Sequence, residues 1–297
     1  MSFEPRHRHL PIGGQSLHVV ETGAPDGRPY LLLHGWPESW RGWEGVMRAA
    51  DPDARLIAID LPGIGGSTGP ATGGAKRRLA EVVHELVRHL GLTGATLVGH
   101  DAGGMIAYAY LRHHAGADAA GVAGVVIMNT VIPGVAPWDE VLANPSIWHF
   151  GLHAVPALPE TLVEGRQPEY FAYFYDALSV DAARITPELR AAHAAAYAGR
   201  AALTAGFDLY RAFGRDARDN AAAAEAGPAG TPVLYLRGEG EHGDLAAYAR
   251  GFREAGVGNL ETALVPGAGH FAPEEAPARV WSLISGFAGS LRLHPSV

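Results

Sequence analysis

The sequence predicts an α/β fold in which a mostly parallel sheet carries one large helical insertion. Apolar strand-like runs alternate with helix-like stretches in the first 130 residues, which is the pattern of repeated β-α-β units. The clearest unit is ATLVGHDAGG at 95–104, where an apolar strand turns directly into a helix. Gly99 and Gly103 lack the Cβ atoms that would hold that strand and helix apart. From residue 133 to about 230 no strand-like run occurs, so helices interrupt the sheet there.

The expected elements follow in order along the chain. Residues 16–22 alternate like an outer strand, and a turn at 24–28 precedes a strand at 30–33. A strand at 55–60 leads into a glycine-rich loop, and apolar residues at helical spacing predict an amphipathic helix over 75–90. After the unit at 95–104, whose helix starts near residue 102, come strands at 122–129, 232–238 and 260–267 and a last helix at 275–290.

The insertion is interpreted as a lid. We assign residues 133–217 to a helical lid and residues 1–132 and 218–297 to the core domain. The lid interrupts the chain between the sixth and seventh large strands, and would cover the carboxyl ends of the strands, where open α/β sheets bind ligands. Its many aromatic side chains suit a hydrophobic ligand, although the same side chains could pack the lid on the core.

Composition excludes several classes of protein. A net charge of −8 without a long basic block gives no reason to expect nucleic acid or an anionic membrane surface as a partner. Cysteine is absent, which excludes disulfides, thiolate metal sites and a thiol nucleophile. The first ten residues lack the apolar core of a signal peptide, and the longest apolar run, around 122–128, is too short to span a bilayer. We therefore expect a cytoplasmic protein, for which a homodimer is possible.

Four motifs carry a resemblance to a known family. They are HGWPESW at 34–40, DLPGIGGS at 60–67, VGHDAGG at 98–104 and PGAGHFAPEE at 266–275. Together, and over essentially the whole chain, they resemble the epoxide hydrolase and dehalogenase branch of the α/β-hydrolases, and most of all the Cif-like bacterial epoxide hydrolases. The resemblance implies an eight-stranded, mostly parallel sheet with helices on both faces and an inserted lid.

Asp101 stands at the apex of the G-x-nucleophile-x-G turn, where this superfamily usually carries serine. A carboxylate in that place attacks an sp3 carbon and becomes joined to the substrate as an ester, which water later cleaves. We therefore expect Asp101 to open an epoxide or to displace a halide. The backbone N–H groups of Trp36 and Ala102 are expected to form the oxyanion hole when the ester is cleaved.

The resemblance places the catalytic base at His270, in the loop after the last strand. Imidazole ordinarily titrates near neutral pH, so one side chain can take a proton from water and return it. His34 and His100 flank the motifs and are interpreted as packing and hydrogen-bonding residues.

The acid that orients His270 has two candidate places, one after the sixth strand and one after the seventh. The Cif-like acid position after the sixth strand holds Asn129 here, which accepts a hydrogen bond but cannot compensate an imidazolium charge. After the seventh strand Glu241 occupies the G-x-x-acid position, with Glu239 and Asp244 as substitutes. We favour Glu241. The alternative is that these acids form a solvated loop and Asn129 alone orients the base.

Two lid segments, SIWHF at 146–150 and FDLYRAF at 207–213, resemble the segments that carry the ring-opening residues of Cif-like enzymes. The residue-by-residue carry-over assigns His149 and Tyr210. An imidazole and a phenol can both donate to the departing epoxide oxygen without being strong competing nucleophiles. For Tyr210 the alternative is an aromatic packed on the inner face of a lid helix.

These residues predict an epoxide hydrolase that forms a vicinal diol. The expected substrate is a small-molecule hydrophobic epoxide with water as co-substrate, and no metal or organic cofactor is implied. One alternative is a haloalkane or haloacid dehalogenase using the same Asp-His pair, but such enzymes carry Trp or Arg directly after the nucleophile, where this chain has Ala102. The other is a non-catalytic, hydrolase-like binding protein; Asn129 is a mild hint towards it, and an intact Asp101 and His270 argue against it.

Overall fold

The described chain forms one twisted sheet with helices on both faces. The structure is a computed structural model, and it describes residues 3–115 and 121–291. Residues 1–2, 116–120 and 292–297, which belong to the predicted core domain, lie outside the described residues. Within the described ranges the sheet has eight strands in the order β1-β2-β4-β3-β5-β6-β7-β8. They are β1 Arg6–Ile12, β2 Gln15–Gly23, β3 Arg28–Leu33, β4 Ala54–Ile59, β5 Ala95–His100, β6 Val122–Met128, β7 Val233–Gly238 and β8 Leu260–Val265.

The predicted, mostly parallel sheet is confirmed. The strands β4, β3, β5, β6, β7 and β8 run parallel, while β1 and β2 are antiparallel to their neighbours. The central strand β5 is buried at every position, as expected for a strand covered by helices on both faces. Strand β1 is not among the predicted elements. Its first four residues, RHRH, are exposed, so no alternation of buried and exposed side chains marks it as a strand.

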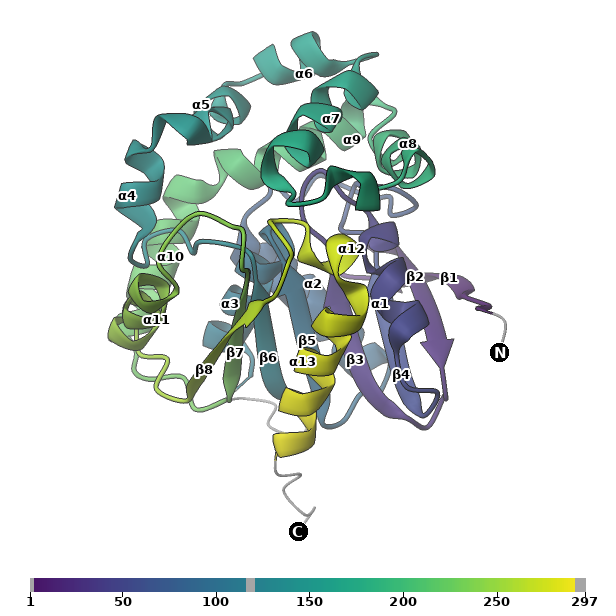
Figure 1. The fold of residues 1–297 in the computed structure, drawn as a ribbon, viewed down its shortest axis with the longest axis vertical. Helices are drawn as coiled ribbons and strands as arrows, with labels where there is room; N and C mark the ends of the chain where they lie inside the picture. Colours follow the sequence, from purple (N-terminus) through teal and green to yellow (C-terminus); the bar gives the residue numbers. More distant parts are fainter. Residues whose placement is uncertain (1–2, 116–120, 292–297) are drawn as a thin grey trace.

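Two helical layers cover the sheet, and each buries its own apolar core. One layer holds α1 and α13 on the face that carries Val20, Leu32 and Val98. The other holds α2, α3 and α11 on the opposite face, with Leu33, Leu97 and Ile127. Figure 1 displays the two layers on either side of the strands. The bounds are η1 Trp40–Trp43, α1 Glu44–Ala49, α2 Lys76–His89, α3 Ala102–His113, α11 Leu245–Glu254, α12 Ala272–Glu275 and α13 Pro277–Ser290.

The insertion between β6 and β7 is helical and covers the carboxyl ends of the strands (Figure 1). Its helix α10 runs across the predicted boundary at residue 217, so the division into lid and core stays a prediction. The elements are α4 Trp138–Ala143, η2 Pro145–Ile147, α5 Trp148–Ala154, α6 Leu158–Val163, α7 Gln167–Leu178, η3 Ala182–Arg184, α8 Pro187–Ala196, α9 Arg200–Arg211 and α10 Phe213–Glu225.

A buried ion pair joins helix α2 to helix α10, the last helix of the insertion. Lys76, the first residue of α2 and the one lysine of the sequence, places its Nζ 2.9 Å from Asp216 Oδ2 on α10. The same ammonium donates to the carbonyl of Leu209, and the Lys76 backbone N–H donates to Asp216 Oδ1 at 2.9 Å. The end of α9, which carries Tyr210, is thereby held against the start of α2.

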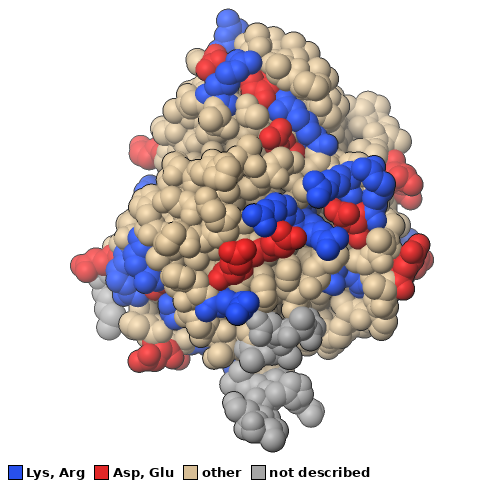
Figure 2. Space-filling view, turned by 180° about the vertical axis from the view of Figure 1, so that it is seen from behind, with Lys and Arg blue, Asp and Glu red and all other residues tan. Residues whose placement is uncertain are grey.

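The surface in Figure 2 carries basic and acidic side chains intermixed rather than gathered into a single-sign patch. None of the helices in the described part of the chain is long and apolar enough to cross a membrane.

Candidate active site

The site is built around the turn between β5 and α3. Asp101 occupies the turn with φ 47° and ψ −119°, a backbone conformation that non-glycine residues rarely adopt. A Cβ added at Gly99 would collide with the Gly103 backbone, and one added at Gly103 would collide with the Leu33 carbonyl. The glycines therefore let the turn close tightly enough to lift the Asp101 carboxylate to the carboxyl end of the sheet.

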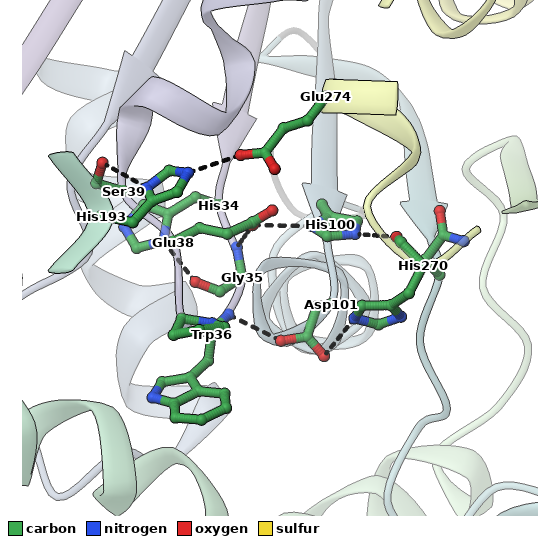
Figure 3. Close-up of polar contacts among 12 residues, drawn as sticks. His34, Gly35, Trp36, Glu38, Ser39, His100, Asp101, His193, His270 and Glu274 are labelled. Carbon is green, nitrogen blue, oxygen red and sulfur yellow. Dashed lines mark hydrogen bonds and ion pairs between the residues drawn. The ribbon is translucent and has the colours of Figure 1, made fainter. Parts of the chain in front are cut away.

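One oxygen of Asp101 is held by the loop after β3. The Trp36 backbone N–H donates to Asp101 Oδ2 at 2.8 Å, as Figure 3 shows. Ala102 is the first residue of α3, and N–H groups at a helix start have no acceptor within the helix. Its role in the oxyanion hole stays a prediction.

The other oxygen of Asp101 faces His270. His270 Nε2 lies 4.0 Å from Asp101 Oδ1, and His270 Nδ1 lies 3.0 Å from Glu241 Oε1. Because an ionised carboxylate only accepts, Nδ1 is the nitrogen that donates to Glu241, and the neutral imidazole therefore has Nε2 as its acceptor on the side of Asp101. This is the tautomer that a base acting on water beside Asp101 needs.

Glu241 is the predicted acid that reaches His270. Its second oxygen, Oε2, accepts from Asn129 Nδ2 at 2.9 Å and lies 3.2 Å from the Arg237 guanidinium. Burial by itself raises the pKa of Glu241, but the hydrogen bond with His270 and the charge of Arg237 outweigh it and lower that pKa below its ordinary value. Glu241 is thus kept ionised beside the imidazole.

The other candidate acids lie in different places. Asn129 Nδ2 donates to Glu241 and to the Gly269 carbonyl. Glu239 accepts from the Gly267 N–H at 3.0 Å, and Asp244 caps α11 by accepting from the Ala246 N–H at 2.9 Å. In this arrangement Asn129 supports Glu241, while Glu239 and Asp244 serve their own loop and helix.

The two predicted lid donors lie together above this centre. The rings of His149 on α5 and Tyr210 on α9 are 5.9 Å apart, and Tyr210 lies 5.6 Å from the Trp36 ring. Burial, and then the proximity of His270, lower the pKa of His149 to about 3. Burial, and then the negative charge of Asp101, raise the pKa of Tyr210 well above 10. At neutral pH both side chains are uncharged groups that can donate a hydrogen bond.

A buried ion pair behind the site was not predicted. Glu38 Oε2 accepts from the Gly35 N–H at 2.7 Å and from His100 Nδ1 at 2.9 Å, and His100 Nε2 donates to the His270 carbonyl at 2.8 Å (Figure 3). Although burial opposes both charges, their attraction lowers the pKa of Glu38 to about 2 and raises that of His100 to about 9. The charged pair links the Trp36 loop to the His270 loop. The sequence marks Glu38 only as an acid inside the HGWPESW motif, and no spacing relates it to His100.

A second unpredicted group lies within the lid. His153, one helical turn after His149, is fully buried, and its Nε2 lies 2.7 Å from the Tyr170 hydroxyl. Its ring packs 4.4 Å from Tyr210 and 4.5 Å from Trp36, between centroids. The spacing of four residues from His149 was the available signal, because it places both histidines on one face of a helix.

A groove of about 610 Å³ opens beside Tyr210. It lies between α4, α5 and the junction of α9 and α10, and Tyr210 forms part of its wall. The aromatic side chains that line it are Trp138, Trp148, Phe150, Tyr210 and Phe213. The residues that the structure describes contain no cluster of three or more His, Asp or Glu side chains suited to a metal ion.

Comparisons with known proteins cover almost the whole chain. The sequence profile of a family described as alpha/beta hydrolase fold matches residues 29–277. A soluble epoxide hydrolase from Corynebacterium sp. (strain C12) is 30% identical, over 98% of this chain and 100% of that protein. Cfl2 from Burkholderia cenocepacia superposes with a TM-score of 0.87 at 28% identity, covering 98% of this chain and 99% of that one. The Cif epoxide hydrolase from Acinetobacter nosocomialis gives 0.82 at 25% identity, covering 96% and 88%.

Proposed function

The chain belongs to the α/β hydrolase fold family, in its epoxide hydrolase branch, and on that basis we propose that it converts an epoxide to a vicinal diol through an ester on Asp101. The observation that carries the proposal is that the two oxygens of the Asp101 carboxylate have different neighbours. Oδ2 accepts from the Trp36 N–H, whereas Oδ1 is turned towards His270.

In the first half of the reaction, Asp101 Oδ1 attacks the less hindered carbon of the epoxide. The new C–O bond forms as the ring C–O bond breaks, and the electron pair of that bond moves to the departing oxygen. Tyr210 gives this oxygen its proton, while the neutral His149 imidazole donates a hydrogen bond to it. The product of this half is a hydroxyalkyl ester on Asp101.

In the second half, His270 takes a proton from water and the hydroxide adds to the Asp101 carbonyl carbon. The oxyanion that forms accepts from the N–H groups of Trp36 and Ala102, and ionised Glu241 compensates the imidazolium charge. Collapse of the intermediate breaks the ester C–O bond, the added hydroxyl passes its proton to the leaving alkoxide oxygen, and the Asp101 carboxylate is regenerated. The proton held by His270 restores the phenol of Tyr210 as the diol leaves.

The aromatic rings around Tyr210 favour a hydrophobic epoxide. Tyr210 packs against Trp36, Phe150 and Phe213, so an epoxide held at Tyr210 would meet apolar side chains. The soluble epoxide hydrolase from Corynebacterium supports the same reaction class for this chain.

The test is a trap for the ester. Protein carrying His270→Ala is incubated with a panel of aryl, aliphatic and polycyclic epoxides, and in parallel with haloalkanes and haloacids, and its intact mass is measured. We expect a mass increase equal to the whole epoxide, mapped to the Asp101 peptide and absent from His270→Ala/Asp101→Asn. An adduct that has lost halogen would move the function to dehalogenation. A folded protein without any adduct would leave the binding-protein alternative.

A further inference from the structure

We infer that His193 and Glu274 are positioning residues. Through them the lid helix α8 fixes the position of the Trp36 N–H relative to His270. The inference rests on the proposed function and extends it, because it assigns to the lid a part in ester hydrolysis, not only in binding the epoxide or opening its ring.

His193 reaches from the lid into the core. Its Nε2 lies 2.6 Å from Glu274 Oε1 on α12, and its Nδ1 lies 3.2 Å from the Ser39 hydroxyl, as Figure 3 shows. The two ring nitrogens of His193 thus join the Glu274 carboxyl group to the Ser39 hydroxyl, with one nitrogen donating and the other accepting. His193 is 0% exposed, so both hydrogen bonds are made without competition from bulk water.

The two partners of His193 belong to the two loops that carry the chemistry. Ser39 comes three residues after Trp36, whose N–H contacts Asp101. Glu274 comes four residues after His270, and its own N–H donates to the Phe271 carbonyl at 2.9 Å. The imidazole of His193 therefore bridges the loop that contains Trp36 and the loop that contains His270.

This bridge lies beside the Glu38–His100 pair. A Cβ placed at Gly42 would stand 3.3 Å from Glu274 Oε1 and 3.4 Å from Glu38 Oε1, so the two carboxylates flank the same glycine. The pairs bind the same two loops, His100 from the core side and His193 from the lid side.

Other lid groups hold the same two loops. Tyr175 on α7 donates to the Pro37 carbonyl at 2.8 Å. The Leu178 carbonyl at the end of α7 accepts from the His270 N–H at 2.9 Å. A hydrophobic side chain at position 193 would fill the space at lower desolvation cost, so the polar bridge points to orientation as its purpose.

The expected consequence is selective for the second half of the reaction. Ester hydrolysis needs the Trp36 N–H, His270 and a water in one geometry, whereas attack on the epoxide needs Asp101 and the lid donors. Small displacements of positioned groups cost about tenfold to a hundredfold in rate. Loss of the bridge should therefore slow hydrolysis more than ester formation.

The experiment measures each half-reaction in rapid-quench single turnover with an epoxide that the wild type converts. His193→Leu removes both hydrogen bonds, and His193→Gln keeps a donor near the position of Nε2. The matched control is His89→Leu, at an exposed histidine on the end of α2. We expect His193→Leu to slow ester hydrolysis about tenfold or more, to change ester formation far less, and to accumulate ester at steady state. His193→Gln should recover most of the hydrolysis rate.

A substrate-free arm separates this inference from the proposed function. Amide hydrogen exchange of peptides covering 34–43 and 266–275 should speed up in His193→Leu and stay unchanged in His89→Leu. If the wild type converts no epoxide, the proposed function fails. The exchange measurement still tests whether His193 holds the two loops in place. Unchanged exchange in both peptides, or equal slowing of the two half-reactions, would overturn the positioning role, as would a variant that only melts earlier with wild-type rates below its melting temperature.

Discussion

The chemistry proposed at Asp101 depends on how the two oxygens of one carboxylate are distinguished. Oδ2 is held by the Trp36 N–H at 2.8 Å, and Oδ1 faces His270 Nε2 at 4.0 Å. The positive φ of Asp101 is a strained conformation that the tight glycine packing around it maintains. The orientation of the Asp101 carboxylate is therefore determined mainly by the backbone conformation at this residue.

The first prediction concerns the acid behind His270. Glu241→Gln should reduce kcat by roughly 10² to 10⁴-fold, because a neutral amide neither fixes the tautomer of His270 nor compensates its imidazolium charge. Steady-state kinetics on an epoxide substrate will measure it. Glu239→Gln is the control on the same loop, and a Glu241→Gln loss no greater than that of the control would contradict our choice of acid.

The second prediction separates the two lid donors. Tyr210→Phe should slow ester formation by roughly 10² to 10⁴-fold, because the departing oxygen loses its proton source, and should leave ester hydrolysis nearly unchanged. His149→Phe should slow the same step less, since that imidazole donates without giving up its proton. Single-turnover rates will compare both with Tyr173→Phe, an exposed lid tyrosine. A Tyr210→Phe defect in hydrolysis alone would refute the assignment.

At the residue scale, the structure brings together the predicted site residues whose sequence signal was local. Asp101, His270 and Glu241 stand in short motifs, and the structure places all three side chains in one chain of contacts. The Glu38–His100 and His193–Glu274 pairs join positions 62 and 81 residues apart, and the sequence contains no spacing that relates them. Such pairs become visible only after the sheet and the lid have been assembled.

At the scale of elements, the strand-turn-helix unit and the parallel strands were predictable because their apolar runs and glycines are local signals. The antiparallel edge strand β1 was not, since its exposed, charged side chains carry no alternation. The lid was predictable as helical, but its end was not. No composition change marks residue 217, and α10 continues through it from Phe213 to Glu225.

The third prediction concerns the junction of α2 with the lid. Lys76→Met leaves Asp216 buried without its cation and should reduce the free energy of unfolding by about 3–5 kcal/mol. Adding Asp216→Leu should recover much of that loss, because the buried carboxylate is then gone as well. Urea unfolding of the two single variants and the double variant measures the coupling. Additive losses in this cycle would indicate that the pair contributes little.

At the scale of the whole molecule, the buried histidines set the response to acid. The pKa of His149 is lowered to about 3, and those of His153 and His34 are lowered too, in each case chiefly by burial. Since these folded-state pKa values lie below the ordinary 6.5, the folded state holds fewer protons than the unfolded state in this range. Stability should fall as the pH drops below 6.5.

The Glu38–His100 pair acts on both sides of this range. The pKa of His100 is raised to about 9, so its contribution is complete below pH 6.5 and is lost as the pH rises through 9. The pKa of Glu38 is lowered to about 2, so its contribution is complete above pH 4.5 and is lost as the pH falls through 2. Together with the neutral histidines, the pair places the greatest stability near pH 6.5.

The fourth prediction tests the acid limb of this profile. Each neutral buried histidine should cost up to about 1.4 kcal/mol of stability per pH unit below 6.5. Urea unfolding at pH 7.5 and pH 5 should therefore show a larger loss of unfolding free energy in the wild type than in His149→Phe. The variant has no imidazole at position 149 to take up a proton on unfolding. Equal losses in the two proteins would mean that His149 is protonated in the folded state at pH 5.

The burial of Lys76 has a practical consequence for handling the protein. Its ammonium is enclosed by Asp216 and the Leu209 carbonyl, and no other residue of the sequence supplies a side-chain amine. Reagents that acylate primary amines, such as succinimidyl esters, will find no reactive lysine while the fold holds. Labelling located at the Lys76 peptide, and so distinguished from labelling of the chain's α-amine, therefore reports opening of the α2–α10 junction.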